Sequence, residues 1–172
     1  PEKRSKLFSK ITKLVKSYKI IKIDPPEIDA ALAQDSGINL NWLEAIKTVE
    51  ILNFLQPERA FIDCPSPNTN AYRSYIRERL NNKNMHLIVE AKADVNHLPA
   101  SAASILAKVT RDEEIEKIRK KYGEVGPGYQ SNPITQKFIQ ENFDKHPEIF
   151  RHSWSTWKNQ DKKKKQAKLD EF

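Results

Sequence analysis

The sequence predicts an α/β fold in which helices flank a largely parallel sheet. Short apolar, β-branched runs alternate with longer segments of helical periodicity, and the first two runs each end in an aspartate that prolines follow closely. Strands that alternate with helices form βαβ units, whose strands are parallel. The 172 residues suffice for one domain with a buried core, or for one domain with a small appendage, but not for two full domains.

The first third of the chain contains two predicted helices and two predicted strands. Apolar residues at helical spacing predict helices over residues 1–18 and 41–55. Runs rich in isoleucine and aromatic residues predict strands over residues 20–23 and 60–63. Turn signals end both runs, which gives the order helix, strand, helix, strand.

The next part of the chain continues the alternation. It predicts a helix over residues 69–80, a strand over residues 86–90, and a longer helix over residues 101–122 that Gly123 ends. Three strands are few for a sheet that carries so many helices. Further strands are therefore expected before Pro1.

The composition of the chain changes after Gly123, from helix-forming to turn-forming residues. Residues 126–129 read Gly-Pro-Gly-Tyr, a stiff turn-rich loop, and Asn132 with Pro133 begins another helix. The predicted organisation is an α/β domain over residues 1–122 that is incomplete at its N-terminus, a helical appendage over residues 123–158, and a disordered, lysine-rich linker with a terminal peptide over residues 159–172.

Charge and composition narrow the class of partner. The chain carries 30 basic and 23 acidic residues, a net charge of +7, which favours a polyanion such as nucleic acid, although the lysine run at residues 162–165 also fits a solvated tail. Cys64 is the single cysteine, so no internal disulfide can form. No apolar stretch reaches the ~18 residues of a membrane span. These features predict a cytoplasmic protein without a membrane partner.

Two aspartates are candidates for metal binding. Asp63 ends the strand at residues 60–63, and Asp94 lies four residues beyond the strand at residues 86–90. Ligands of parallel α/β sheets bind beyond the carboxyl ends of the strands. Two carboxylates there form half of a site for a hard cation such as Mg²⁺. The alternative is that each aspartate caps a turn or a helix.

The helix at residues 101–122 begins with small residues, which allow close packing on a sheet. Lys108 and Arg111 lie three residues apart on one face of it, where they could contact phosphates. The alternative is a closely packed helix with two surface cations.

Three motifs together resemble a known family. Lys92-Ala93-Asp94, residues 101–112 and residues 126–133 are similar to the central and C-terminal signature of type 2 ribonucleases H, ribonuclease HII, in its archaeal form. The resemblance extends from Pro1 to Lys158. It implies a ribonuclease H-like mixed sheet with flanking helices and a C-terminal helical appendage. It also implies an endonuclease that hydrolyses the RNA strand of RNA/DNA hybrids and cuts at ribonucleotides embedded in duplex DNA.

The resemblance implies roles for single residues. The family holds two divalent ions, Mg²⁺ or Mn²⁺, with four carboxylates, of which Asp63 matches the third and Asp94 the fourth. Tyr129 matches the tyrosine that packs against the ribose at the RNA–DNA junction and helps to sense its 2′-hydroxyl, the group that distinguishes RNA from DNA. Lys108 and Arg111 match basic positions near the substrate backbone.

One family motif is missing from the sequence. The first two carboxylates of the family lie in a strand that reads Asp-Glu-Ala-Gly-Arg-Gly, and residues 1–172 contain no such segment. We therefore expect these residues alone to fold poorly and to be inactive, since Asp63 and Asp94 face no other carboxylates and the sheet exposes unpaired edges. A cleavage assay with Mg²⁺ and a DNA duplex that contains one ribonucleotide tests this, and robust cutting refutes it.

A second hypothesis follows from the missing motif. The chain could be a non-catalytic protein, descended from such an enzyme, that binds hybrids or a clamp. The coding sequence upstream of Pro1 separates the two, because an in-frame Asp-Glu-Ala-Gly-Arg-Gly there indicates the enzyme.

The C-terminal peptide carries a separate signal. Gln166, Leu169 and Phe172 have the spacing Q-x-x-L-x-x-F, which resembles the archaeal peptide that docks on the replication sliding clamp. One helical turn places Leu169 and Phe172 side by side, and Gln166 can hydrogen-bond the rim of a groove. Random tails match so short a pattern at times. We expect a monomeric protein that binds the clamp through this peptide.

Overall fold

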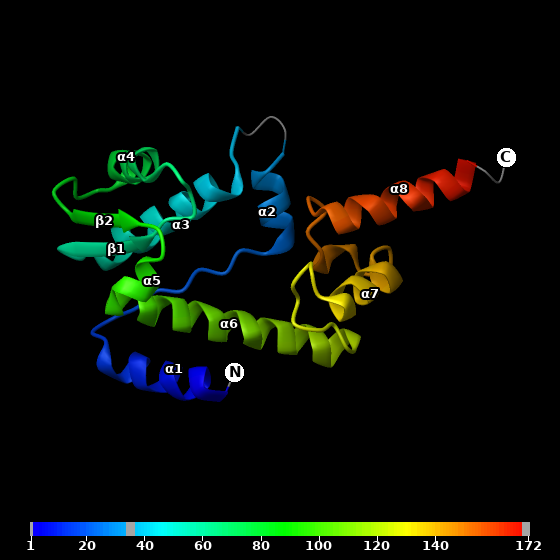
Figure 1. The fold of residues 1–172 in the computed structure, drawn as a ribbon, viewed down its shortest axis with the longest axis horizontal. Coiled ribbons are helices and arrows are strands. Elements are labelled where there is room, and N and C mark those ends of the chain that lie inside the picture. The colour runs from blue at the N-terminus through cyan, green and yellow to red at the C-terminus, as the bar shows by residue number, and fades with distance from the viewer. Residues whose placement is uncertain (1, 34–36, 170–172) are drawn as a thin grey trace. The chain divides into compact units, whose positions relative to one another are not determined.

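The computed structural model describes residues 2–33 and 37–169, and side chains over residues 3–33 and 37–162. Its elements in chain order (Figure 1) are α1 (Glu2–Leu14), α2 (Pro25–Ala31), α3 (Leu40–Leu55), β1 (Arg59–Asp63), α4 (Thr69–Arg79), β2 (His86–Glu90), α5 (Ala93–Asn96), α6 (Leu98–Tyr122), α7 (Pro133–Asn142), the 3-10 helix η2 (Pro147–Ile149) and α8 (Ser155–Leu169).

The chain divides into two compact units. Unit 1 comprises Pro1–Lys22 and Asn39–Arg111, and unit 2 comprises Ile23–Ile38 and Asp112–Phe172. The division falls inside α6, whereas the sequence suggested a boundary after residue 122. Helix α2 belongs to unit 2 although it lies far from the rest of that unit in the sequence.

Unit 1 is built on two parallel strands. β1 pairs with β2 from Arg59 opposite His86 to Asp63 opposite Glu90. Alternate strand residues are buried, which is the period expected of a sheet with one face in the core. Helices α3 and α4 complete this core, whose strand and helix side chains include Val49, Leu52, Ala60, Ile62, Tyr72, Ile76, Leu87 and Val89.

Asparagine caps help to set where these helices begin. Asn39 precedes α3 and its side-chain oxygen accepts a hydrogen bond from the Trp42 amide at 3.1 Å. Asn68 does the same for α4 through the Ala71 amide at 3.0 Å. Both caps satisfy amides that have no partner within the helix, so the two helices begin within a residue of their predicted starts.

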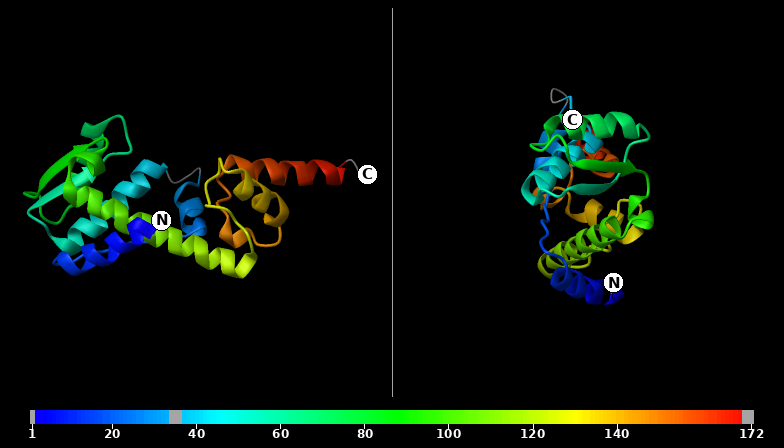
Figure 2. Two further views of the ribbon diagram at one scale, coloured as in Figure 1. Left: turned by 60° about the horizontal axis from the view of Figure 1, so that its bottom comes forward. Right: turned by 90° about the vertical axis from the view of Figure 1, so that its left-hand side faces the viewer.

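The structure contradicts the strand predicted over residues 20–23. Within the described residues this run belongs to neither strand of the sheet. Ile20 and Ile21 instead line an apolar cavity of about 440 Å³ together with residues of α1, α3 and α6. Figures 1 and 2 show α1 beside the first half of α6. An apolar run forms a strand only where another strand supplies ladder hydrogen bonds, and the described part of unit 1 offers none to this run.

The structure also contradicts the disorder predicted for the segment after residue 158. Residues 159–169, predicted as a disordered linker, continue α8 as helix. Lysine, glutamine and alanine are good helix formers, and the costly first turn is already formed where Trp154 and Trp157 pack in unit 2.

Unit 2 has its own apolar core around Val125, Phe138, Ile139 and Phe150. Helix α2 joins this unit through Asp29, whose carboxylate accepts hydrogen bonds from the His152 amide at 2.6 Å and the Ser153 amide at 3.0 Å. Burial raises the pKa of Asp29, but the hydrogen bonds from Ser153 and His152 outweigh it, and the pKa lies below its usual value. No helix in the described part of the chain is long and apolar enough to cross a membrane.

Candidate active site

The two candidate metal ligands, Asp63 and Asp94, come together at the carboxyl edge of the strand pair. Asp63 is the last residue of β1, opposite Glu90 in β2. Lys92 adopts a left-handed conformation, with φ of 60°, and turns the chain after β2. The amide of Ala93 then donates a hydrogen bond to Oδ1 of Asp63 at 3.2 Å. Asp94 therefore follows directly on the residue that binds Asp63.

Helix α6 holds the Asp94 carboxylate from another side. The Ser104 hydroxyl donates a hydrogen bond to Oδ2 of Asp94 at 3.3 Å, and Nζ of Lys108 lies 3.8 Å from the same oxygen. Lys108 is 53 % exposed and Asp94 27 %, so this ion pair is screened and contributes little to stability. A metal cation can therefore take the place of Lys108 beside Asp94, or a phosphate the place of Asp94 beside Lys108, at a small cost in stability. Arg111 lies less than one turn further along α6 and is half-buried.

A third acidic residue near this edge, Glu44, was not predicted from the sequence. Glu44 lies on α3 and is exposed, but partial desolvation of its carboxyl by the surrounding protein and the negative charge of Asp63 raise its pKa. Its neighbours Leu43 and Ala45 are both buried. A glutamate between two apolar residues of a predicted helix is the sequence feature that could have indicated Glu44. That helix shares a core with the strand that ends in Asp63.

A second polar cluster fixes the short helix that carries Asp94. Oε1 of Glu90 accepts a hydrogen bond from the Asn96 side chain at 2.9 Å and lies 3.0 Å from Nε2 of His97. The hydrogen bond from Asn96 is the main reason that the pKa of Glu90 lies below its usual value. The His97 ring packs on Phe61 with centroids 4.4 Å apart. Asn96 and His97, which follow Asp94, thus tie α5 to the end of β2, a role that the sequence pattern did not reveal.

The donors at this edge fit part of a divalent-metal site. Among the described residues, no three His, Cys, Asp or Glu side chains gather closely enough to hold a metal ion. Asp63 and Asp94 offer carboxylate oxygens, the ligands that suit Mg²⁺ and Mn²⁺. Such ions keep several positions for water and substrate, so two carboxylates can contribute to a site that needs further donors.

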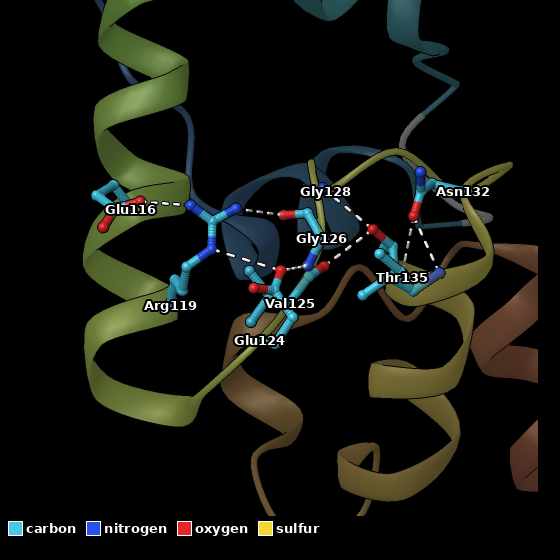
Figure 3. A network of polar contacts seen from close by, with 9 residues as sticks. Glu116, Arg119, Glu124, Val125, Gly126, Gly128, Asn132 and Thr135 are labelled. Atoms are coloured by element: carbon cyan, nitrogen blue, oxygen red, sulfur yellow. Dashed lines mark hydrogen bonds and ion pairs between the residues drawn. The ribbon is translucent and has the colours of Figure 1, made fainter.

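Tyr129 lies in unit 2, in the loop between α6 and α7. It is 53 % exposed, and its carbonyl accepts a hydrogen bond from the Asn132 amide at 2.9 Å. Gly126 and Gly128, which precede it, have φ of 65° and 72°. The loop is held by polar contacts to α6 and α7 (Figure 3).

Gly126 has no room for a side chain. A Cβ there would lie 2.8 Å from the Thr135 hydroxyl oxygen and 3.1 Å from Ile134 Cβ. Gly126→Ala is therefore expected to destabilise the protein by the cost of a left-handed residue, roughly 1–2 kcal/mol, and by a further cost of the close contact. Denaturant unfolding measures the sum.

Gly123→Ala is the matched control for this prediction. Gly123 also has positive φ, 93°, but a Cβ there meets nothing within 4 Å. The control carries the backbone strain without the contact. Equal losses of stability in the two variants would contradict the prediction.

The residues of the C-terminal peptide are placed only in part. Gln166 and Leu169 lie within α8, in its portion without described side chains, and Phe172 lies outside the described residues. Their predicted role in clamp binding is not tested by this geometry.

The fold places the chain in a class of solved nucleases. The crystal structure of ribonuclease H2 from Pyrococcus horikoshii OT3 superposes with a TM-score of 0.85 at 36% identity, covering 95% of this chain and 77% of that one. The ribonuclease HII of a PCNA:RNase HII complex from Archaeoglobus fulgidus gives 0.80 at 29% identity, covering 90% and 74%. The class is therefore the mixed α/β fold of type 2 ribonucleases H, which confirms the predicted fold.

Sequence comparison gives the family. The family model described as Ribonuclease HII matches residues 1–157. Ribonuclease HII of Pyrococcus furiosus is 43% identical over 181 aligned positions, covering all of this chain and 78% of the relative, and that of Methanococcus maripaludis C5 is 38% identical, covering 98% and 72%. The chain belongs to the ribonuclease HII family, metal-dependent endoribonucleases that cleave the RNA strand of RNA/DNA hybrids.

Proposed function

We propose that this protein is an endonuclease that hydrolyses the RNA strand of RNA/DNA hybrids and also cuts at single ribonucleotides in duplex DNA. Asp63 and Asp94 are its metal-binding catalytic residues. The observation that supports this best is the hydrogen bond from the Ala93 amide to Asp63, which joins the ends of β1 and β2 beside Asp94. Both family-matched carboxylates thereby reach one edge of the sheet.

The chemistry follows from the donor set. Two divalent ions, Mg²⁺ or Mn²⁺, supply the charge that stabilises the attacking and leaving oxygens of phosphodiester hydrolysis. Asp63 and Asp94 would hold these ions together with further donors, and the hydrogen bonds from Ala93 and Ser104 orient the two carboxylates. Lys108, whose Nζ lies 3.8 Å from Oδ2 of Asp94, would offer its charge to the scissile phosphate.

Substrate recognition is assigned to three side chains, Tyr129, Lys108 and Arg111. Tyr129 packs against the ribose whose 2′-hydroxyl marks the RNA strand, which is the feature that separates a hybrid from duplex DNA. Lys108 and Arg111 contact the backbone, a sequence-independent contribution that weakens as salt rises. The net charge of +7 suits this polyanionic substrate.

A substrate comparison tests the function. The product of the intact gene is incubated with Mg²⁺ and three duplexes of one sequence: an RNA/DNA hybrid, a DNA duplex with one ribonucleotide, and an all-DNA duplex. The first two should be cut to 3′-hydroxyl and 5′-phosphate ends and the third should stay intact. Tight hybrid binding without cutting, in both Mg²⁺ and Mn²⁺, would favour the non-catalytic alternative.

A second proposed function is binding of the replication sliding clamp through Gln166, Leu169 and Phe172. It is supported by the spacing of these residues and by the structural neighbour that was solved as a PCNA:RNase HII complex. A helical turn with two apolar side chains on one face is a suitable ligand for an apolar groove.

A further inference from the structure

The loop that carries Tyr129 is attached to α7 through one buried hydroxyl group. Thr135 is 5 % exposed, and its Oγ1 donates a hydrogen bond to the Val125 carbonyl at 2.9 Å. The same oxygen accepts a hydrogen bond from the Gly128 amide at 3.1 Å (Figure 3). One side chain thus bridges both ends of the Gly-Pro-Gly turn.

Further contacts hold the loop on both sides of Tyr129. The Asn132 amide donates to the Tyr129 carbonyl at 2.9 Å, and Oδ1 of Asn132 accepts from the Ile134 and Thr135 amides at 3.0 and 3.3 Å. Nη2 of Arg119 donates to the Gly126 carbonyl at 3.2 Å. The backbone around Tyr129 is therefore fixed, while its side chain remains largely exposed.

We propose that Thr135 is a positioning residue for recognition of the RNA strand. Its hydroxyl orders the backbone of residues 125–128 and thereby presents Tyr129 to the ribose in one orientation. This inference rests on the proposed role of Tyr129. A loop that is already ordered pays less conformational entropy on binding, so more of the energy of the contact between Tyr129 and the ribose appears as affinity for the hybrid.

The hydroxyl group of Thr135, and not only the shape of its side chain, is needed to hold the loop. Valine has nearly the shape of threonine but can neither accept from Gly128 nor donate to Val125. At a site this buried both backbone groups lose their partner, which costs far more than the loss of one exposed contact. Serine keeps both hydrogen bonds and gives up only a methyl group.

Hybrid binding by variants of the intact gene product tests the proposal. The dissociation constants of an RNA/DNA hybrid and of an all-DNA duplex are measured by fluorescence anisotropy with EDTA present, so that no cleavage occurs. Thr135→Val is expected to weaken hybrid binding about tenfold. It should leave DNA binding unchanged, and Thr135→Ser should restore the hybrid preference. Thr135→Ala repeats the test without a branched side chain if the valine variant folds poorly.

A double-mutant cycle separates positioning from general destabilisation. In a Tyr129→Ala background, Thr135→Val should have no further effect on hybrid binding, because the residue that it positions is gone. Ile139→Val is the matched control: Ile139 lies on the same helix and is 1 % exposed, so this variant loosens the unit 2 core without touching the loop hydrogen bonds. It should keep the hybrid preference.

The outcomes distinguish the inference from the function on which it rests. If Tyr129→Ala weakens hybrid binding but neither Thr135→Val nor Thr135→Ala does, the role of Thr135 is overturned and that of Tyr129 stands. A loss that persists in the Tyr129→Ala background, or that Ile139→Val reproduces, also overturns it. If Tyr129→Ala binds the hybrid as tightly as the unchanged protein, the proposed role of Tyr129 fails and the inference fails with it.

Discussion

Replacement of Asp63 or Asp94 by asparagine is expected to reduce metal-dependent cleavage of an RNA/DNA hybrid by more than about 100-fold, since even loss of a group that only supports a metal ligand costs 10–100-fold. Asparagine has the size of aspartate, and its carbonyl oxygen can still accept the hydrogen bond from Ala93 or Ser104. The substitutions therefore remove the negative charge that attracts a divalent ion while the local structure is kept.

Glu58→Gln is the matched control for these two variants. Glu58 is an exposed carboxylate next to β1, at the end of the strand opposite to Asp63, and its loss should leave cleavage unchanged. Initial rates are measured over a range of Mg²⁺ and Mn²⁺ concentrations, together with Mn²⁺ affinity by electron paramagnetic resonance. Full activity of Asp63→Asn or Asp94→Asn would remove that residue from the metal site.

Deletion of residues 166–172 is expected to weaken clamp binding by ~100-fold or more, because the loss of two buried apolar side chains costs about 3–6 kcal/mol. Cleavage of the hybrid in the absence of the clamp should not change, since the candidate ligands Asp63 and Asp94 lie in unit 1. Calorimetric titration with an archaeal sliding clamp measures the first effect, and the cleavage assay measures the second.

A charge variant separates the peptide from the basic helix that precedes it. Substitution of residues 162–165 by alanine removes four positive charges and keeps Gln166, Leu169 and Phe172. This variant should bind the clamp with nearly the affinity of the unchanged protein at physiological salt, since exposed charges are screened there. If the deletion leaves clamp affinity intact, the peptide is not the ligand.

Local patterns were sufficient for most of the secondary structure. Helices α3, α4 and α7 begin within a residue of the predicted positions, because caps and proline act on the nearest turn of the chain. β1 and β2 were found by composition and by the turn signals beyond them. The short helices α2 and α5 were not predicted, and two other differences have separate causes. Residues 20–23 have no partner strand in the described part of unit 1, whereas residues 159–169 continue a helix whose start is anchored in the core of unit 2.

The candidate site was predictable only in outline. Asp63 was singled out because it ends a predicted strand, and Asp94 because it follows the next strand within the motif Lys92-Ala93-Asp94. The parallel register of β1 with β2 brings the ends of the two strands to one edge. Glu44 was missed because its helix, α3, shares a core with β1 only in the folded chain. The contact of Lys108 with Asp94 was missed for the same reason.

The sequence by itself determined the family, predicted both strands of the sheet and most of the long helices, and singled out the candidate side chains for binding a metal or a ribose. These follow from residue identity and from spacing over a few turns, which act locally. Only the tertiary structure decided which carboxylates share an edge, which lysine forms an ion pair with Asp94, and which buried hydroxyl orders the loop before Tyr129. Hydrogen bonds and ion pairs of this kind form between elements that are brought together by burial of apolar surface, and the sequence pattern does not contain the distances between them.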